Sequence, residues 1–167
     1  ITITDDATHY VELTCASGQS FRDNASVRSN ALYYSQANGV ALRNTSGSNY
    51  AVYTSTHTRL TGLQIASEAG ASTLITSGGS ATVIDKSLFF GGEMYDQGAS
   101  SVVSNSAFIN TNGPFTRVLG VGGSGITFNF CTMVAPSGNP RTNVIQGDTG
   151  SYTCNSCAMF GCTNLNG

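Results

Sequence analysis

A six-residue pattern of apolar and polar positions recurs five times along the chain. Each copy reads apolar, short polar, variable, small, variable and large apolar, and we number these residues positions 1 to 6. The copies are LTGLQI at 60–65, IDKSLF at 84–89, VSNSAF at 103–108, FNFCTM at 128–133 and CNSCAM at 154–159. Their spacing varies from 19 to 26 residues, whereas the pattern keeps its length. This is typical of a repeat protein whose strands are fixed by stacking and whose loops are free to vary.

A second apolar run precedes the copies, and Gly-rich breaks lie between the two kinds of run. The second runs are at residues 50–53, 73–76, 117–121 and 143–145. Each repeat therefore holds about three short strands, and no segment shows the 10–12 residues of helical period that indicate a helix. Strands this short can pair in parallel with their copies one repeat away, at about 4.8 Å, so the pattern predicts an all-β stack of about six to seven coils.

Equivalent positions of successive copies are expected to lie directly above one another. Position 4 then forms a column that consists of Leu63, Ser87, Ser106, Cys131 and Cys157. Position 2 carries short polar residues, among them Asn129 and Asn155. Because such side chains tolerate bent backbone and bond neighbouring peptide groups, we expect the chain to turn at position 2. Residues 40–42 and 11–13 read as weaker upstream copies, with Val40 and Val11 in the register of Leu63.

The register and the polar turn position, with an apolar step on either side, resemble the right-handed parallel β-helix of the pectin-lyase-like superfamily. The resemblance covers about residues 30–162 and implies a right-handed, single-stranded parallel β-helix in a single domain, 1–167. Residues 1–30 would be an N-terminal lead-in or cap, 31–162 the coils, and 163–167 the start of a further coil or a linker. Asn129 and Asn155 match the family's stacked asparagines, whereas Thr61, Asp85 and Ser104 depart from them.

A narrower resemblance concerns the first part of the chain. The segments that carry it are DATHYV at 6–11, GQSF at 18–21, NGVA at 38–41 and LTGLQ at 60–64. Together they resemble β-helix proteins among the structural proteins of tailed bacteriophages. This implies a non-catalytic virion part, such as a fibre, spike or capsid decoration, at the virion surface or extracellular. Its partners would be copies of itself, with a trimer favoured, other virion proteins and host-surface polysaccharide.

Charge is scarce in this chain. Only 10% of its 167 residues are Asp, Glu, Lys or Arg, and the net charge is −2, against a typical charged share of about 25%. A low net charge together with 15 Phe and Tyr residues excludes a disordered chain. The seven basic residues are scattered along the chain and do not form a basic cluster that would bind nucleic acid. No apolar run is long enough to cross a membrane. A charge-poor surface suits a chain that is covered by symmetry mates.

Two carboxylates are the candidates for catalysis. Glu93 and Asp96 lie in the segment 91–97, which we predict to be a loop. Glycosidases need paired carboxylates at roughly 5–10 Å, so the alternative function is a polysaccharide-degrading glycosidase or lyase. The competing interpretation is a solvated loop between coils whose charges serve solubility. No cofactor and no metal site is predicted, because neither histidine lies in a recognisable ligand or nucleophile motif.

Cys154 and Cys157 form a Cys-x-x-Cys, which read alone suggests a redox or zinc site. The repeat favours a different interpretation, because it places these side chains inward as small hydrophobes and sets Cys131 next to Cys157. The spacing of adjacent coils lies within the range that a disulfide permits. We nevertheless expect free thiols, since phage particles assemble in a reducing cytoplasm. Cys162 alone does not supply the two further ligands of a zinc site.

Four tyrosines gather toward the N-terminal coils and are candidate glycan contacts: Tyr33, Tyr34, Tyr50 and Tyr53. Exposed tyrosines can stack on sugars or bury against a neighbouring protomer. Strand alternation predicts that Tyr50 and Tyr53 point to opposite faces. Three functions remain open: a structural component, which we favour, a glycan-binding module, and an enzyme.

Overall fold

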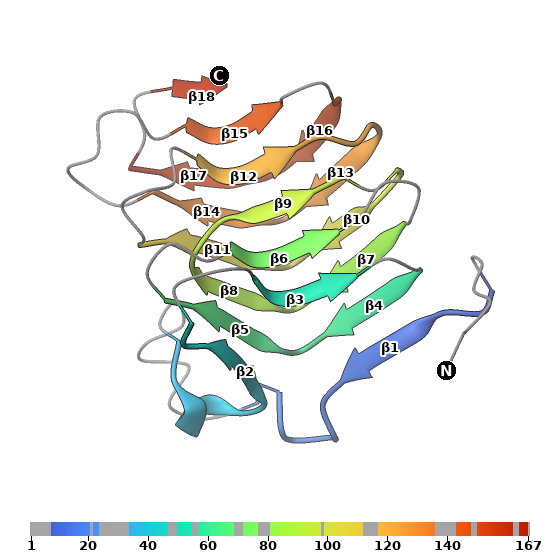
Figure 1. Ribbon diagram of the computed structural model, residues 1–167, viewed down its shortest axis with the longest axis vertical. Helices are drawn as coiled ribbons and strands as arrows, with labels where there is room; N and C mark the ends of the chain where they lie inside the picture. Colours follow the sequence, from blue (N-terminus) through green and yellow to red (C-terminus); the bar gives the residue numbers. More distant parts are fainter. Residues whose placement is uncertain are drawn as a thin grey trace.

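Short parallel strands make up most of the computed structural model of this chain (Figure 1). The structure describes residues 8–20, 22–23, 34–46, 50–54, 57–68, 72–76, 81–97, 99–111, 117–135, 143–147, 150–161 and 164–166. The strands form three six-stranded sheets, and neighbours within a sheet are three strands apart along the chain. The fold is therefore all-β, and the chain passes from one sheet to the next in a fixed order.

We call the sheets A, B and C. Sheet A contains β1 (Val11–Thr14), β4 (Thr58–Thr61), β7 (Thr82–Asp85), β10 (Val102–Ser104), β13 (Ile126–Asn129) and β16 (Tyr152–Asn155). Sheet B contains β2 (Ala41–Asn44), β5 (Gln64–Ser67), β8 (Leu88–Gly91), β11 (Ala107–Asn110), β14 (Thr132–Val134) and β17 (Ala158–Phe160). Sheet C contains β3 (Tyr50–Thr54), β6 (Ser72–Thr76), β9 (Met94–Asp96), β12 (Arg117–Val121), β15 (Asn143–Gly147) and β18 (Asn164–Asn166).

The predicted stacking of the six-residue pattern is confirmed. Positions 1 and 2 end the strands of sheet A, where Asn129 pairs with Asn155 in parallel. Positions 5 and 6 begin the strands of sheet B, where Phe89 pairs with Phe108. Every described strand pair is parallel. Residues that are distant in sequence but equivalent in the repeat therefore become neighbours in space.

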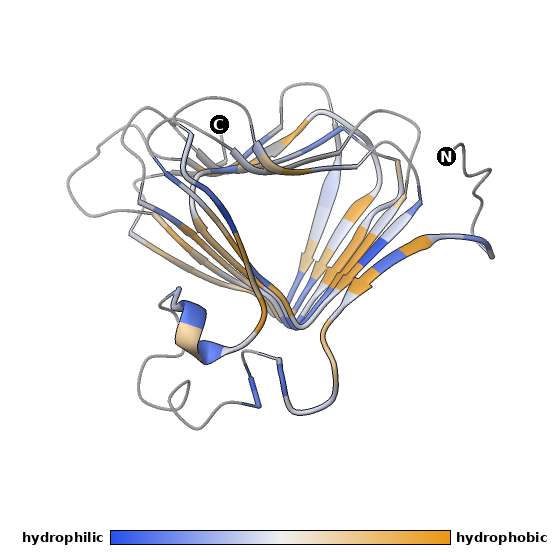
Figure 2. Ribbon diagram, turned by 60° about the horizontal axis from the view of Figure 1, so that its bottom comes forward, coloured by the Kyte–Doolittle hydropathy of each residue, from blue (hydrophilic) through white to orange (hydrophobic). Residues whose placement is uncertain are grey.

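The core lies between the three sheets, which form the sides of a triangle in Figure 2. Its largest columns come from positions 1 and 6 and contain Leu60, Ile84, Val103 and Phe128 in the first and Ile65, Phe89, Phe108 and Met133 in the second. Each of these side chains is at most 1% exposed. Complete burial of a large apolar side chain contributes about 1.5–3 kcal/mol, so the repeated columns supply most of the driving force for stacking.

The turn between sheets A and B uses a left-handed residue, and it lies one residue later than predicted. Position 2 is the last residue of each sheet A strand, whereas position 3 has a φ between +50° and +74° in all five copies: Gly62, Lys86, Asn105, Phe130 and Ser156. Only one of these is glycine, and a left-handed conformation costs other residues about 1–2 kcal/mol. The pairing of the adjoining strands offsets this cost in every repeat.

Two further predictions about the strands need correction. Residues 94–96 form strand β9 of sheet C, so the segment 91–97 is not a loop. The pattern missed this strand because it has only three residues and ends in a carboxylate. Val11 belongs to β1 of sheet A, where it pairs with Thr58, and is not in the register of Leu63. By contrast, Ala41 pairs with Gln64, which places Val40 in the predicted register.

Tyr50 and Tyr53 also differ from the prediction. Their rings stack with centroids 5.1 Å apart, so they do not point to opposite faces. β3 keeps one register with β6, in which Tyr50 pairs with Ser72 and Tyr53 with Ile75. The contact between the two rings therefore shows that the strand departs from its two-residue period between these residues, although the register of the pairing does not change.

A 3₁₀ helix, η2 (Gln36–Asn38), lies beside sheet B, before the first strand of that sheet (Figure 1). The Ser35 side chain caps it by accepting a hydrogen bond from the Ala37 amide. Among the described residues there is no helix with the length and apolar character needed to span a bilayer.

Candidate functional site

A cavity of about 500 Å³ lies on the outer face of sheet B, beneath the segment that contains η2. Its aromatic part consists of Tyr34 and Phe90, whose rings stack with centroids 6.4 Å apart and an interplanar angle of 24°. Phe90 is on β8 and alternates with the core residue Phe89, so its ring lies on the outer side of the sheet. The volume is in the range of pockets that hold small ligands.

A buried glutamine holds the covering segment against sheet B. The Gln64 side chain is 0% exposed. Its Oε1 accepts a hydrogen bond from the Ser35 amide at 3.0 Å, and its Nε2 donates to the Ser35 carbonyl at 2.9 Å. This double contact fixes the backbone beside Tyr34 and satisfies a polar side chain that would otherwise be costly to bury.

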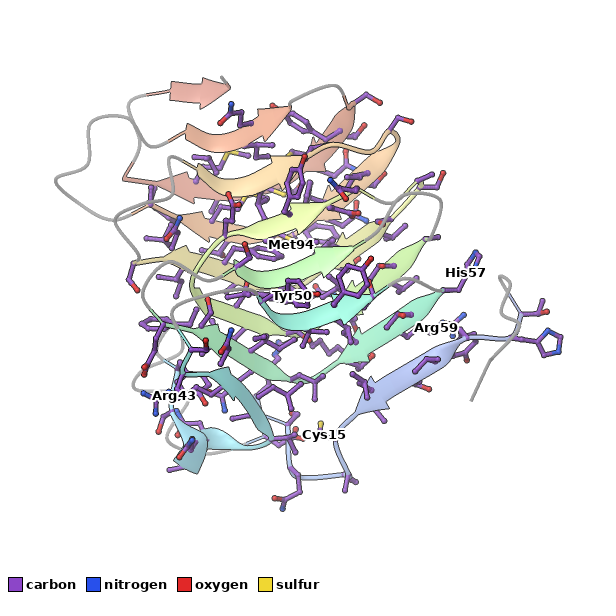
Figure 3. The ribbon with its side chains drawn as sticks, in the orientation of Figure 1. Cys15, Arg43, Tyr50, His57, Arg59 and Met94 are labelled. Atoms are coloured by element: carbon purple, nitrogen blue, oxygen red, sulfur yellow. The ribbon has the colours of Figure 1, made fainter. Side chains whose placement is uncertain are left out.

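An ion pair lies at the rim of the cavity. Arg43 of β2 contacts Glu68, which follows β5, and about two fifths of each side chain is exposed. Figure 3 shows Arg43 beside β2, on the side of the stack that carries η2. The Tyr34 hydroxyl is buried and has no hydrogen-bond partner among the described residues. The cavity thus combines two ring faces with a guanidinium, a carboxylate and a hydroxyl, which can hold a small ligand with both apolar and hydroxylated surfaces.

The four predicted tyrosines do not form one patch. Tyr34 lines the cavity on sheet B, whereas Tyr50 and Tyr53 lie on β3 of sheet C. Tyr50 and Tyr53 are 38% and 50% exposed. Tyr33 lies outside the described residues. Short distance along the chain was therefore a poor guide to proximity, because residue 34 lies in the segment that covers sheet B and residue 50 lies on sheet C.

The two candidate catalytic carboxylates are buried. Asp96 is 1% exposed at the end of β9, and Glu93, which precedes β9, is 7% exposed. The interpretation of a solvated loop is therefore wrong. Asp96 alternates with the half-buried Tyr95 and so lies on the same side of β9 as the core residue Met94. A substrate in solvent cannot reach such a carboxylate in this arrangement.

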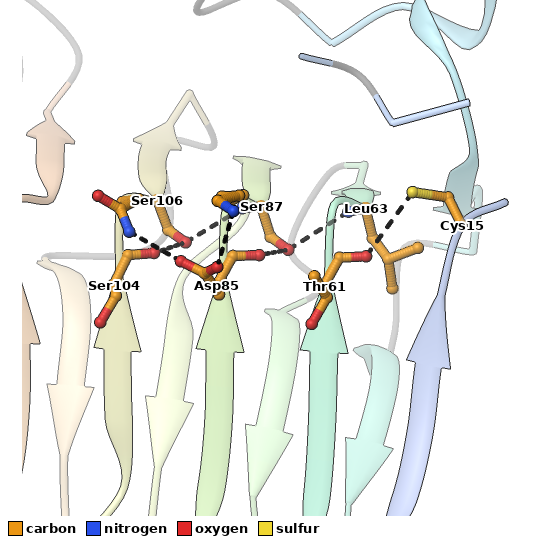
Figure 4. A network of polar contacts seen from close by, with 9 residues as sticks. Cys15, Thr61, Leu63, Asp85, Ser87, Ser104 and Ser106 are labelled. Carbon is orange, nitrogen blue, oxygen red and sulfur yellow. Dashed lines mark hydrogen bonds and ion pairs between the residues drawn. The ribbon is translucent and has the colours of Figure 1, made fainter. Parts of the chain in front are cut away.

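Position 4 forms the predicted column, and its polar members share one set of hydrogen bonds (Figure 4). Ser87 Oγ donates to the Asp85 carbonyl at 3.0 Å and accepts from the Leu63 amide at 3.3 Å. Ser106 Oγ accepts from the Ser87 amide at 3.1 Å. Each hydroxyl thereby connects one repeat to the repeat before it.

The last two members of the column are thiols in the place of these hydroxyls. Cys131 Sγ donates to the Asn129 carbonyl at 3.4 Å, and Cys157 Sγ donates to the Asn155 carbonyl at 3.6 Å. The amides at position 2 also stack, since Asn155 Nδ2 donates to Asn129 Oδ1 at 2.9 Å. The predicted asparagine pair is therefore present, while Asn105 Nδ2 contacts Asp85 Oδ1 lower in the stack.

The cysteines among the described residues are free thiols: Cys15, Cys131, Cys154 and Cys157. Burial raises the pKa of Cys131 to about 11. Burial, with the adjacent Cys157 adding to it, raises the pKa of Cys154 to about 12. No group of three or more His, Cys, Asp or Glu side chains with metal-binding geometry occurs within the described ranges. Cys162 lies outside the described residues.

Sequence reasoning missed the residues that build the cavity, although one signal was present. Arg43 and Glu68 carry opposite charges and are 25 residues apart, two more than the 23-residue repeat that pairs Arg43 with Ala66. In a parallel stack such a pair becomes adjacent, so opposite charges one repeat apart predict contacts across the strands. Gln64 gave no signal, because its position in the pattern is variable.

No protein-family model, no curated protein sequence and no solved structure matches this chain.

Proposed function

We propose that the chain is a right-handed, single-stranded parallel β-helix of about six to seven coils and a non-catalytic structural component of a bacteriophage particle. A fibre, a spike or a capsid decoration at the virion surface fits best, with copies of the chain and other virion proteins as partners. The order of the strands supports this architecture, because every third strand joins the same parallel sheet. Such a stack presents long regular faces to its neighbours.

The observation that carries the structural proposal is an apolar column on the outer face of sheet B. It consists of Ile109, Val134 and Phe160, which are paired in register along β11, β14 and β17, above the cavity that contains Phe90. Ile109 and Val134 are half-buried, and Phe160 is 55% exposed. An ordered apolar row on a surface with few charges is suited to contact with a copy of the same chain, and we favour a trimer.

Sedimentation equilibrium of the purified chain tests this proposal. We expect a trimer that dissociates when a charge enters the column, as in Val134→Glu or Phe160→Glu. Thr153→Glu is the matched control, because Thr153 is exposed on β16 of sheet A, in the same repeat as Phe160. A monomeric wild-type chain, or equal dissociation by Thr153→Glu, would contradict assembly through sheet B.

The cavity on sheet B supports contact with a host-surface glycan as part of the same role. A pyranose ring has an apolar face that can stack on Tyr34 or Phe90 and hydroxyls that can bond to Arg43 and Glu68. The carboxylates of the alternative enzymatic function, in contrast, are buried. We therefore assign glycan contact to Tyr34 among the predicted tyrosines.

An array of bacterial surface oligosaccharides tests this assignment. We expect Tyr34→Ala to weaken binding at least tenfold, because it removes one of the two stacked rings from the cavity. Tyr53→Ala is the control, since Tyr53 is an exposed tyrosine on sheet C. Binding that survives Tyr34→Ala, or that is lost with Tyr53→Ala, would rule out the cavity as the contact site.

A further inference from the structure

Two thiols occupy the same position in adjacent repeats, Cys131 and Cys157. Their neighbours fix the register on both sides, since Asn129 pairs with Asn155 and Thr132 pairs with Ala158. The Ala158 amide also donates to the Cys131 carbonyl at 2.9 Å. Adjacent strands are about 4.8 Å apart, which lies within the Cα separations of about 4.4–6.8 Å that disulfides adopt.

The two side chains lie in the same orientation, each against the repeat before its own. Cys157 Sγ lies 3.6 Å from the carbonyl of Phe128, which belongs to the repeat of Cys131. Cys131 Sγ lies 3.5 Å from the carbonyl of Val103, one repeat earlier. The Cys157 side chain therefore already lies over the repeat of Cys131, and rotation of the Cys131 side chain toward Cys157 would bring the two sulfur atoms together.

We propose that Cys131 and Cys157 form a redox modification site, which a low-molecular-weight disulfide such as oxidised glutathione converts into a cross-link between repeats. This inference does not depend on the function proposed above. The half-buried Cys157 loses its proton and attacks one sulfur of oxidised glutathione, which releases one glutathione thiolate. Cys131 then loses its proton and attacks the Cys157 sulfur of the mixed disulfide, which releases the second glutathione. The protein pair is oxidised by two electrons and glutathione is reduced by two.

The burial of Cys131 slows the second step of this reaction. Cys131 is 1% exposed, and its pKa is raised to about 11, so few of its thiols are ionised at neutral pH. Because the thiolate is the attacking species, we expect the second step to be slow near pH 7 and to accelerate about tenfold per pH unit up to the pKa. The site would thus resist brief oxidation and respond to long exposure.

Cys154 is the competing partner for Cys157. It lies in the same repeat and contacts Cys157, and its pKa is raised further than that of Cys131, to about 12. A Cys154–Cys157 bond would close a short ring within one repeat and would connect nothing to the repeat before it. A Cys131–Cys157 bond instead ties β16 and β17, at one end of sheets A and B, to the preceding strands.

The test is oxidation of the chain, residues 1–167, with oxidised glutathione at pH 8.5, followed by alkylation and non-reducing peptide mapping. We expect a Cys131–Cys157 linked peptide, the loss of two thiols per chain, and a rise in Tm of about 5–10 °C that dithiothreitol reverses. Cys154→Ser should leave all three results unchanged. Linkage of Cys154 to Cys157, linkage to Cys15 or Cys162, or no loss of thiols would overturn the proposal.

The column supplies matched control variants. Cys131→Ser and Cys157→Ser each install the residue that Ser87 and Ser106 already provide at position 4, with the same donation to a position 2 carbonyl. We therefore expect both variants to fold and to keep the Tm of the reduced protein within about 2 °C. Both should lose the oxidation-dependent rise in Tm. A rise that persists in either variant would show that a different cross-link causes it.

Discussion

Replacing Phe108 with alanine is expected to lower the free energy of unfolding by about 3–5 kcal/mol. Phe108 is 1% exposed and lies in the middle of the aromatic part of the core. Its ring stacks on Phe89 with centroids 4.9 Å apart and meets Phe128 edge-on at 6.4 Å. The truncation therefore opens a cavity and removes two ring contacts at once. Urea unfolding followed by circular dichroism measures the loss.

Two controls separate a cavity from a general effect of substitution. Phe108→Leu keeps most of the apolar volume and should cost less than about 1.5 kcal/mol. Val102→Ala, at a side chain that is 37% exposed on sheet A, should change the stability by about 0.5 kcal/mol or less. If Phe108→Ala cost no more than Val102→Ala, the columns between the sheets would not be the main source of stability.

The position of Phe108 was predictable because the pattern of a parallel stack is local. Position 6 holds large apolar residues in every copy, and a column of such residues has to face the core. The same reasoning places Cys131 beside Cys157 and Asn129 beside Asn155 from the sequence alone. Where the pattern is regular, the number of residues between copies does not affect the alignment. The register can be recognised even though the spacing varies from 19 to 26 residues.

The features that the pattern missed are those that break its period. β9 has only three residues and ends in the buried Asp96, so composition indicated a loop where the structure has a strand. Tyr53 lies on the side of Tyr50, where strict alternation along β3 would have placed it on the opposite face. The cavity depends on a segment outside the repeat, which Gln64 holds in place through backbone contacts. Tertiary contacts of this kind leave no periodic signal in a single sequence.

Gly91 is the second position at which a single substitution should have a large effect. It lies at the end of β8 with a φ of +101°, and a Cβ added there would come within 2.0 Å of the Ser67 carbonyl oxygen in the preceding repeat. We expect Gly91→Ala to lower the free energy of unfolding by about 3–5 kcal/mol, since the backbone must shift and also leave its favoured conformation. Thermal and urea unfolding of the variant measure this change.

Gly125→Ala distinguishes the two causes. Gly125 also has a positive φ, +80°, but the atom nearest to an added Cβ is Ser100 Oγ at 3.6 Å, an ordinary contact. This variant should carry only the conformational cost, about 1–2 kcal/mol. The difference in unfolding free energy between the two variants then measures how closely the backbones of successive repeats approach. Gly161 should behave like Gly91, because a Cβ added there would meet the Ala135 carbonyl oxygen of the preceding repeat. Equal losses for Gly91→Ala and Gly125→Ala would mean that the backbone of β8 can move away from Ser67, and that the contact between repeats is looser than the strand register implies.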